Sequence, residues 1–136
     1  MRAMLIFSKN KKTADAPAPA WIKSIEERKT LRILRVKGRI DVAALGESSS
    51  QRALQARQQK GFEYKHLLLD FADVTYIDSS AVAALLLTLR DYQKAHHKLG
   101  VINLGEEPRN MLQIAKVDRL FLSYETEAQA LKDLES

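Results

Sequence analysis

The sequence contains no cysteine among its 136 residues. Disulfide bonds, thiolate metal sites and a cysteine nucleophile are therefore excluded, and the composition fits a reducing compartment. Glycine is also scarce, and the five glycines are scattered along the chain. The chain therefore has no glycine-rich loop of the kind that cradles a phosphate group.

Long apolar runs are absent as well. No segment approaches the roughly 18 consecutive apolar residues of a membrane-spanning helix, and Met4–Phe7 is shorter than the core of a signal peptide, roughly 7–15 residues. We therefore expect a cytoplasmic protein without membrane insertion. With 46% hydrophobic and 29% charged residues, the chain has the composition and the length of one globular domain.

The net charge of +5 is unevenly distributed. The first 12 residues contain no acid and four basic residues, Arg2, Lys9, Lys11 and Lys12. A basic arm can bind nucleic acid, but here no aromatic residues are interleaved with the charges as stacking would require. We interpret the arm as a solvated tail and expect no nucleic-acid partner.

Proline and alanine dominate residues 13–20. Proline favours extended backbone and removes hydrogen-bond donors, so regular structure should begin after this segment. We therefore divide the chain into a basic arm with its linker over residues 1–20 and one domain over residues 21–136.

Beyond the linker, strand-like and helix-like segments alternate. Near alternation of apolar and basic residues predicts a strand over Leu31–Val36 with one solvent-facing side. Gly38 should end this strand, and Asp41 should cap a helix over about residues 42–60 that ends at Gly61.

The rest of the chain continues the alternation. Further apolar runs lie over residues 66–71, 74–77, 99–104 and 120–124. We expect a long helix over about 79–98 closed by Gly100, and a helix with Pro108 in its first turn that runs to about Ala115. Thr126 and Gln129 form a capping box for a last helix that ends at Leu134. Strands separated by helices predict an α/β fold with a largely parallel sheet.

The most informative segment is Asp78-Ser79-Ser80, where a buried strand ends and the long helix begins. Ligands and partners of parallel α/β folds usually meet the carboxyl ends of the strands. The first turn of a helix also presents unpaired N–H groups and partial positive charge, so a phosphate there would be tolerated, although Asp78 would repel it. All three residues are also good N-caps, which leaves a purely structural role open.

From about Ile25 to Leu134 the chain resembles the STAS domain family, and within it the bacterial anti-sigma factor antagonists, also called anti-anti-sigma factors. The most specific match is Val74–Ser80, which follows the family's apolar-Asp-Ser-Ser pattern. Gly38-Arg39-Ile40-Asp41 resembles the family's Gly-Glu-Leu-Asp, Leu67–Phe71 its central strand, and Phe121–Leu131 its closing strand and helix. The resemblance implies a βα superhelix with a small mixed, largely parallel sheet packed by helices.

The resemblance also implies site residues. In that family the serine directly after the aspartate is phosphorylated, which makes Ser79 the acceptor and Ser80 the second candidate. The residues implied to bind a partner are Asp41, Asp78, Ser79, Ser80 and Ala81. The family often has glycine where this chain has Ala81 and Ala83, and alanine favours helix over glycine by about 1 kcal/mol per site, so this helix should begin firmly.

The resemblance implies a phosphorylation-gated regulator that is not an enzyme and needs no cofactor. It would bind an anti-sigma factor or serine kinase with an ATP-binding domain while Ser79 is unphosphorylated, and a phosphatase would reverse the modification. The alternative is a constitutive STAS subunit of a lipid-transport ABC complex or of a stress-signalling scaffold. An enzyme with Ser79 as its nucleophile is a third reading, but the sequence offers no paired base.

Two clusters could suggest a metal site, and we interpret both otherwise. His96 and His97 are adjacent and do not share a helix face, so a favourable interaction with the helix C-terminus is simpler. Asp70, Asp73 and Asp78 are read as caps and turn residues rather than as a cation cage. A weak homodimer is a further expectation, because Met4–Phe7 can add a strand to a neighbouring sheet edge.

Overall fold

The computed structural model of the chain describes residues 19–46 and 65–135. In chain order the described elements are β1 (Ile22–Glu27), β2 (Leu31–Ile40), α3 (Val42–Leu45), β3 (His66–Ile77), α5 (Ser79–Lys94), β4 (Leu99–Ile102), α6 (Glu106–Ile114), the 3₁₀ helix η1 (Asp118–Leu120), β5 (Leu122–Tyr124) and α7 (Glu127–Leu134).

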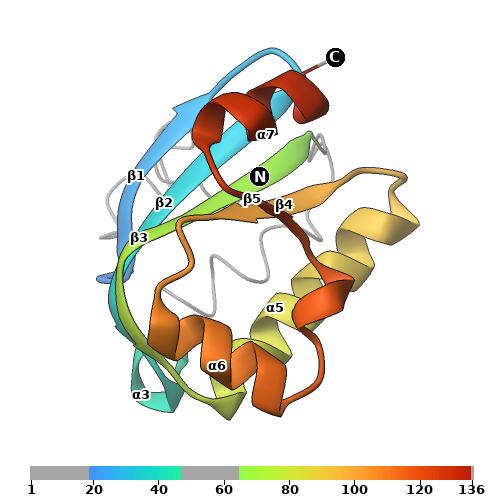
Figure 1. Cartoon of the computed structure of the whole chain (residues 1–136). Coiled ribbons are helices and arrows are strands. Elements are labelled where there is room, and N and C mark those ends of the chain that lie inside the picture. The colour runs from blue at the N-terminus through green and yellow to red at the C-terminus, as the bar shows by residue number, and fades with distance from the viewer. Residues whose placement is uncertain (1–18, 47–64, 136) are drawn as a thin grey trace.

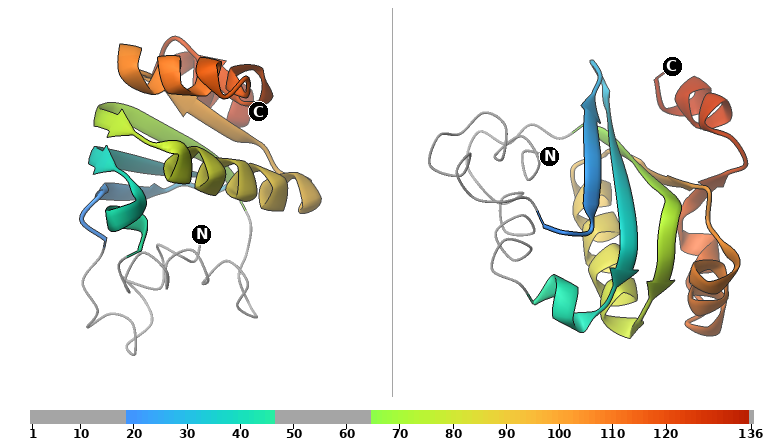
Figure 2. Two further views of the ribbon diagram at one scale, coloured as in Figure 1. Left: turned by 90° about the horizontal axis from the view of Figure 1, so that it is seen from below. Right: turned by 90° about the vertical axis from the view of Figure 1, so that its left-hand side faces the viewer.

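The five described strands form one sheet in the order β1-β2-β3-β4-β5 (Figure 1). β1 runs antiparallel to β2, whereas the β2–β3, β3–β4 and β4–β5 pairs are parallel. α5 covers one face of this sheet and α7 lies on the opposite side (Figure 2). The predicted α/β fold with a small mixed, largely parallel sheet is confirmed.

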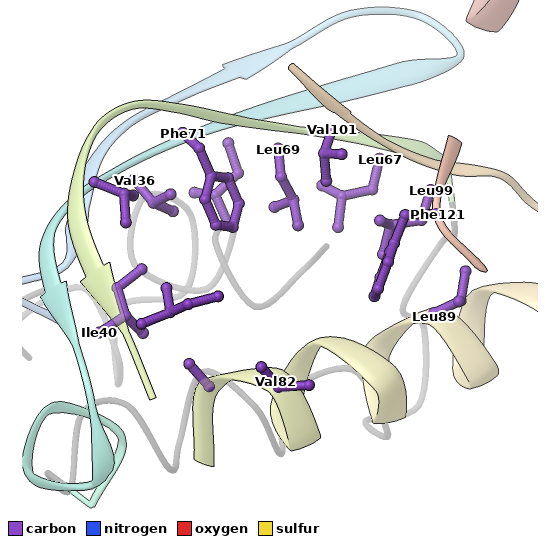
Figure 3. Close-up of a cluster of buried hydrophobic side chains, with 14 of the residues drawn as sticks. Val36, Ile40, Leu67, Leu69, Phe71, Val82, Leu89, Leu99, Val101 and Phe121 are labelled. Atoms are coloured by element: carbon purple, nitrogen blue, oxygen red, sulfur yellow. The ribbon is translucent and has the colours of Figure 1, made fainter. Parts of the chain in front are cut away.

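The central strand β3 serves two hydrophobic clusters, because successive strand residues point to opposite faces. Leu67, Leu69 and Phe71 belong to the larger cluster, which faces α5 and receives Val82 and Leu89 from that helix (Figure 3). On the other face, Leu68 belongs to a smaller cluster that α7 closes with Ala130 and Leu134. The core therefore fixes α5 firmly against the sheet.

Three strand predictions need correction. β1 was not expected, and it pairs with β2. β2 continues through Gly38 to Ile40, and its predicted solvent-facing side is wrong because Arg32 is fully buried. β3 is one strand from His66 to Ile77 and not two apolar stretches separated by a turn.

The end of the long helix also differs from the prediction. α5 ends at Lys94, and Gly100 lies in β4, where an added Cβ would come within 2.8 Å of the Tyr124 ring. His96 instead takes the left-handed conformation (φ 60°) that follows many helix ends. The backbone N–H of His97 donates to the carbonyl of Tyr92 at 2.8 Å and completes this cap.

Other boundaries are shifted by a few residues. β5 begins at Leu122 after η1, whereas α6 runs from Glu106 to Ile114 with Pro108 in its first turn, as predicted. α3 starts after Asp41 as predicted but ends at Leu45 with Gly46 as its C-cap. The rest of the predicted helix with Gly61, the basic arm and Met4–Phe7 lie outside the described residues.

Over the two described ranges, every helix is too short or too polar to cross a lipid bilayer.

Candidate functional site

The candidate site forms where β2 and β3 end side by side. In the parallel ladder between these strands, Ile40 is paired with Ile77. Asp41 and Asp78, the next residue on each strand, therefore emerge at the same edge of the sheet. α3 follows the first aspartate and α5 follows the second.

Each aspartate caps the helix that it precedes. An oxygen of Asp41 accepts the backbone N–H of Ala44 at 3.0 Å, and Oδ1 of Asp78 accepts that of Ala81 at 3.0 Å. Both residues have extended backbone, as N-caps require. The predicted capping role of Asp41 at the start of its helix is confirmed.

Asp78 has a second role that sequence reasoning missed. Its other oxygen, Oδ2, accepts the backbone N–H of Val42 at 2.9 Å. One carboxylate therefore holds the first turns of α3 and α5 together. The sequence has an Ile-Asp dipeptide at the end of each of the two strands, which could have pointed to this contact. Only the parallel register shows that the two aspartates lie side by side.

The two serines occupy the first turn of α5. Ser79 is exposed and Ser80 is half-buried, and within residues 19–46 and 65–135 neither side chain makes a hydrogen bond. Ala81 is only 2% exposed and packs in the larger core cluster. The side chains predicted for partner binding are thus accessible at Asp41, Asp78, Ser79 and Ser80, whereas that of Ala81 points into the fold.

Basic and apolar side chains border the two aspartates. The guanidinium of Arg39 lies 4.2 Å from the ring centroid of Tyr76 and pairs with Asp41 at 3.7 Å. Val42, directly after the first cap, is 65% exposed. The surface around the two aspartates therefore contains a cation from β2 and an exposed apolar side chain from α3.

The three aspartates considered as a cation cage lie in different environments. Asp70 is bound by Arg35 and Asn103, Asp73 pairs with Lys23, and Asp78 caps the helices. Across the part of the chain that the structure describes, no group of three or more potential ligands is suited to a metal ion.

The histidines lie far along the fold from Ser79. His66 begins β3, and His97 follows the opposite end of α5. Their rings meet edge to face, with centroids 5.2 Å apart. Burial lowers the pKa of both imidazoles, and nearby positive charge adds to the effect. They form a packed pair rather than a base for the serine.

The sequence comparison decides the family. The model of the STAS domain matches residues 23–130. The chain belongs to the STAS domain family. A comparison with curated protein sequences gives no match.

Solved structures described as anti-sigma factor antagonists share this fold. A structure described as a putative anti-sigma factor antagonist from Thermotoga maritima has a TM-score of 0.71 at 17% identity, over 83% of this chain and 94% of that one. An anti-sigma factor antagonist from Mycobacterium paratuberculosis has a TM-score of 0.67 at 22% identity, over 88% and 98%.

The Bacillus protein SpoIIAA is similar in two forms. Its unphosphorylated form has a TM-score of 0.65 at 18% identity, over 82% of this chain and 95% of that one. Its phosphorylated form has a TM-score of 0.60 at 17% identity, over 81% and 96%. The STAS fold resembling anti-sigma factor antagonists, which the sequence suggested, is confirmed.

Proposed function

We propose that this STAS domain is a phosphorylation-gated binding module, with Ser79 as the acceptor. The observation that carries the proposal is the exposure of Ser79 in the first turn of α5, directly after the aspartate that joins two helix starts. The hydroxyl is accessible to a kinase, and the surrounding edge is accessible to a partner.

Phosphorylation of Ser79 would alter the surface more than the fold. A phosphate adds about −2 charge at neutral pH, and here it would stand beside the carboxylates of Asp78 and Asp41. The positive end of the α5 dipole partly offsets this charge. A partner docked over the serine would meet a new charged and hydrated group, so binding should weaken while the domain stays folded.

The comparisons supply the partner class of the proposal. The similar structures are described as anti-sigma factor antagonists, and SpoIIAA is described in a phosphorylated form. We therefore assign this chain an anti-sigma factor or serine kinase with an ATP-binding domain as its partner, and a phosphatase that restores Ser79. Ser80 is the second acceptor, and its half-buried side chain makes it less accessible than Ser79.

The test is recovery of the protein from its native cells, with phosphosite mass spectrometry and binding by Ser79 variants. Ser79→Ala should retain an ATP-binding partner, Ser79→Asp should lose most of it, and Ser80→Ala should resemble the unchanged protein. Equal binding by the alanine and aspartate variants would refute the switch.

A second candidate is a constitutive subunit of a lipid-transport ABC complex or of a stress-signalling scaffold. The observation in its favour is the firmly formed start of α5, where Ala81 is packed in the core and Asp78 holds two backbone N–H groups. Such an edge could dock without any phosphate. Co-purification with a transporter ATPase, with Ser79 unmodified, would identify this function.

A further inference from the structure

Arg32 of β2 is a fully buried cation whose hydrogen bonds are incomplete. Its side chain is 0% exposed, and Glu27 of β1 accepts its Nε–H at 2.5 Å. The two terminal nitrogens, Nη1 and Nη2, have no hydrogen-bond partner within the described residues. A buried donor without an acceptor costs free energy, and the cost is larger when the donor is charged. The guanidinium therefore has two donor nitrogens that an acceptor would stabilise.

The guanidinium lies on the sheet face that α5 covers. Arg32 alternates with Leu34 along β2, and Leu34 belongs to the larger hydrophobic cluster. Leu67 of β3, the partner of Arg32 across the ladder, points toward α5 (Figure 3). Tyr92, near the end of α5, is 2% exposed and interacts electrostatically with Arg32. The neighbours of the guanidinium on this face are therefore apolar and aromatic.

The charges around Arg32 leave one positive charge in excess. Lys65 donates to Glu27 at 3.0 Å, and Glu27 is also the acceptor of Arg32, so two cations share one carboxylate. Among the acids of the described ranges, only Glu27 is hydrogen-bonded to Arg32. Burial lowers the pKa of Arg32 to about 10, so the group remains cationic at neutral pH. A single additional negative charge would neutralise this cluster.

We propose that Nη1 and Nη2 of Arg32 form a binding site for a small monocarboxylate. A carboxylate presents two coplanar oxygens that match the planar fork of a guanidinium, and its single charge neutralises the cluster with Glu27 and Lys65. A phosphate group carries close to two negative charges and would leave one in excess. Because Arg32 is 0% exposed, a small molecule fits this site better than an acidic side chain on the surface of another protein. Glu27 and Lys65 are 26% and 22% exposed, so the site borders solvent on their side.

The carboxylate site is separate from the Ser79 edge. Leu67, beside Arg32, lies near the start of β3, whereas Ser79 follows the end of that strand. Roughly 30 Å of strand separates the two positions. A bound carboxylate should therefore stabilise the domain without touching the phosphoacceptor, and the inference does not depend on the proposed switch.

The first experiment measures the urea midpoint of the full chain at neutral pH and constant ionic strength, with sodium acetate, sodium benzoate, benzamide or sodium phosphate added. Acetate or benzoate should raise the midpoint in a saturable way, since a ligand of the folded state stabilises it by mass action. Benzamide, the uncharged counterpart of benzoate, and phosphate should give no comparable rise. No saturable rise with either carboxylate, or an equal rise with benzamide or phosphate, would overturn the proposal.

The second experiment assigns the binding to Arg32 by isothermal titration calorimetry. Arg32→Lys keeps the charge but lacks the paired planar donors, so it should weaken carboxylate binding at least about tenfold. Arg32→Met, which leaves Glu27 paired with Lys65, should abolish binding. Arg39→Lys is the matched control, because Arg39 is 64% exposed and pairs with Asp41, and it should bind like the unchanged protein.

Two results would contradict this assignment. Unchanged carboxylate affinity in either Arg32 variant, once circular dichroism shows that the variant is folded, would place the binding elsewhere. A crystal structure of the unchanged chain with the bound carboxylate gives the direct check. The carboxylate oxygens should lie within hydrogen-bond distance of Nη1 and Nη2 of Arg32, and any other position would overturn the proposal.

Discussion

Asp70 within β3 and Asp78 directly after this strand lie in two contrasting regions of the molecule. Asp70 lies within the strand and is 7% exposed, and its oxygens accept hydrogen bonds from Arg35 at 2.7 Å and from Asn103 at 3.0 Å. Asp78 follows the end of the strand and accepts backbone N–H groups from the first turns of two helices. The same residue type thus completes a buried network of side-chain hydrogen bonds in one place and caps two helices at an accessible surface in the other.

The difference shows which parts of the fold are available for signalling. Arg35 also pairs with Glu127 of α7 at 2.8 Å, so the Asp70 network ties that helix to the sheet. The donors and acceptors of this network are paired with one another. A protein that bound there would have to break these hydrogen bonds and ion pairs. Asp78 instead stabilises backbone groups beside the exposed Ser79, where a new charge can act without disrupting the core.

The largest expected effect is on the Asp70 network. Asp70→Ala should lower the free energy of unfolding by about 2–3 kcal/mol, because it leaves partly buried donors of Arg35 and Asn103 without this acceptor. Asp73→Ala is the matched control on the same strand. Its ion pair with Lys23 is about half exposed, so its loss should cost less than about 1 kcal/mol. Urea denaturation monitored by circular dichroism measures both.

If Asp73→Ala lowered the free energy of unfolding as much as Asp70→Ala, the proposed distinction between the buried Asp70 network and a surface ion pair would be wrong. Partner binding should survive Asp70→Ala in all folded molecules, since this network does not contact the Ser79 edge.

The next effect concerns the two caps. Asp78→Ala should cost about 2 kcal/mol and Asp41→Ala about 1 kcal/mol, because the first loses acceptors at two helix starts and the second at one. Amide hydrogen exchange provides the sharper test. The Val42 N–H should exchange faster in Asp78→Ala but remain protected in Asp41→Ala, and equal exchange in the two variants would contradict the bridging role of Asp78.

The caps could be predicted because their signals are local. Asp41, Asp78 and Thr126 each precede a helix by one residue, and each accepts the N–H that the sequence pattern predicted. The choice of Ser79 as acceptor rests on the family resemblance of the Asp78-Ser79-Ser80 motif and stays a prediction. The bridge from Asp78 to Val42 could not be read from the sequence, since it depends on the register that pairs Ile40 with Ile77 across two strands.

The strands were harder to predict where charges enter the sheet. Arg32 is fully buried beside Glu27 of β1, which accepts its Nε–H at 2.5 Å, whereas its two terminal nitrogens have no hydrogen-bond partner within the described residues. Burial lowers the pKa of Arg32 to about 10. Likewise, β3 runs through Asp70 and Asp73 because Arg35 and Lys23 neutralise them. These partners lie on other strands, so the acids looked like turn residues in sequence.

The smallest effect should come from the histidine pair at the far end of α5. Burial lowers the pKa of His66 and His97 below the ordinary value of 6.5. Between the lowered pKa and 6.5 the unfolded chain binds more protons than the folded one, so the free energy of unfolding should fall as pH drops through this range. Protonation would also remove the acceptor that Nδ1 of His66 offers to the N–H of Lys98 at 3.0 Å.

Denaturant titrations between pH 7.5 and 5 measure this effect in isolation. Hydrogen bonds from Asn103, Ala72 and Arg35 outweigh burial and lower the pKa of Asp70, so its contribution is lost only at more acidic pH, below 3.8. The double variant His66→Asn/His97→Gln should flatten the pH dependence, whereas His96→Asn should preserve it because His96 is exposed and asparagine tolerates the left-handed backbone there. An unchanged slope in the double variant would assign the effect to groups outside the pair.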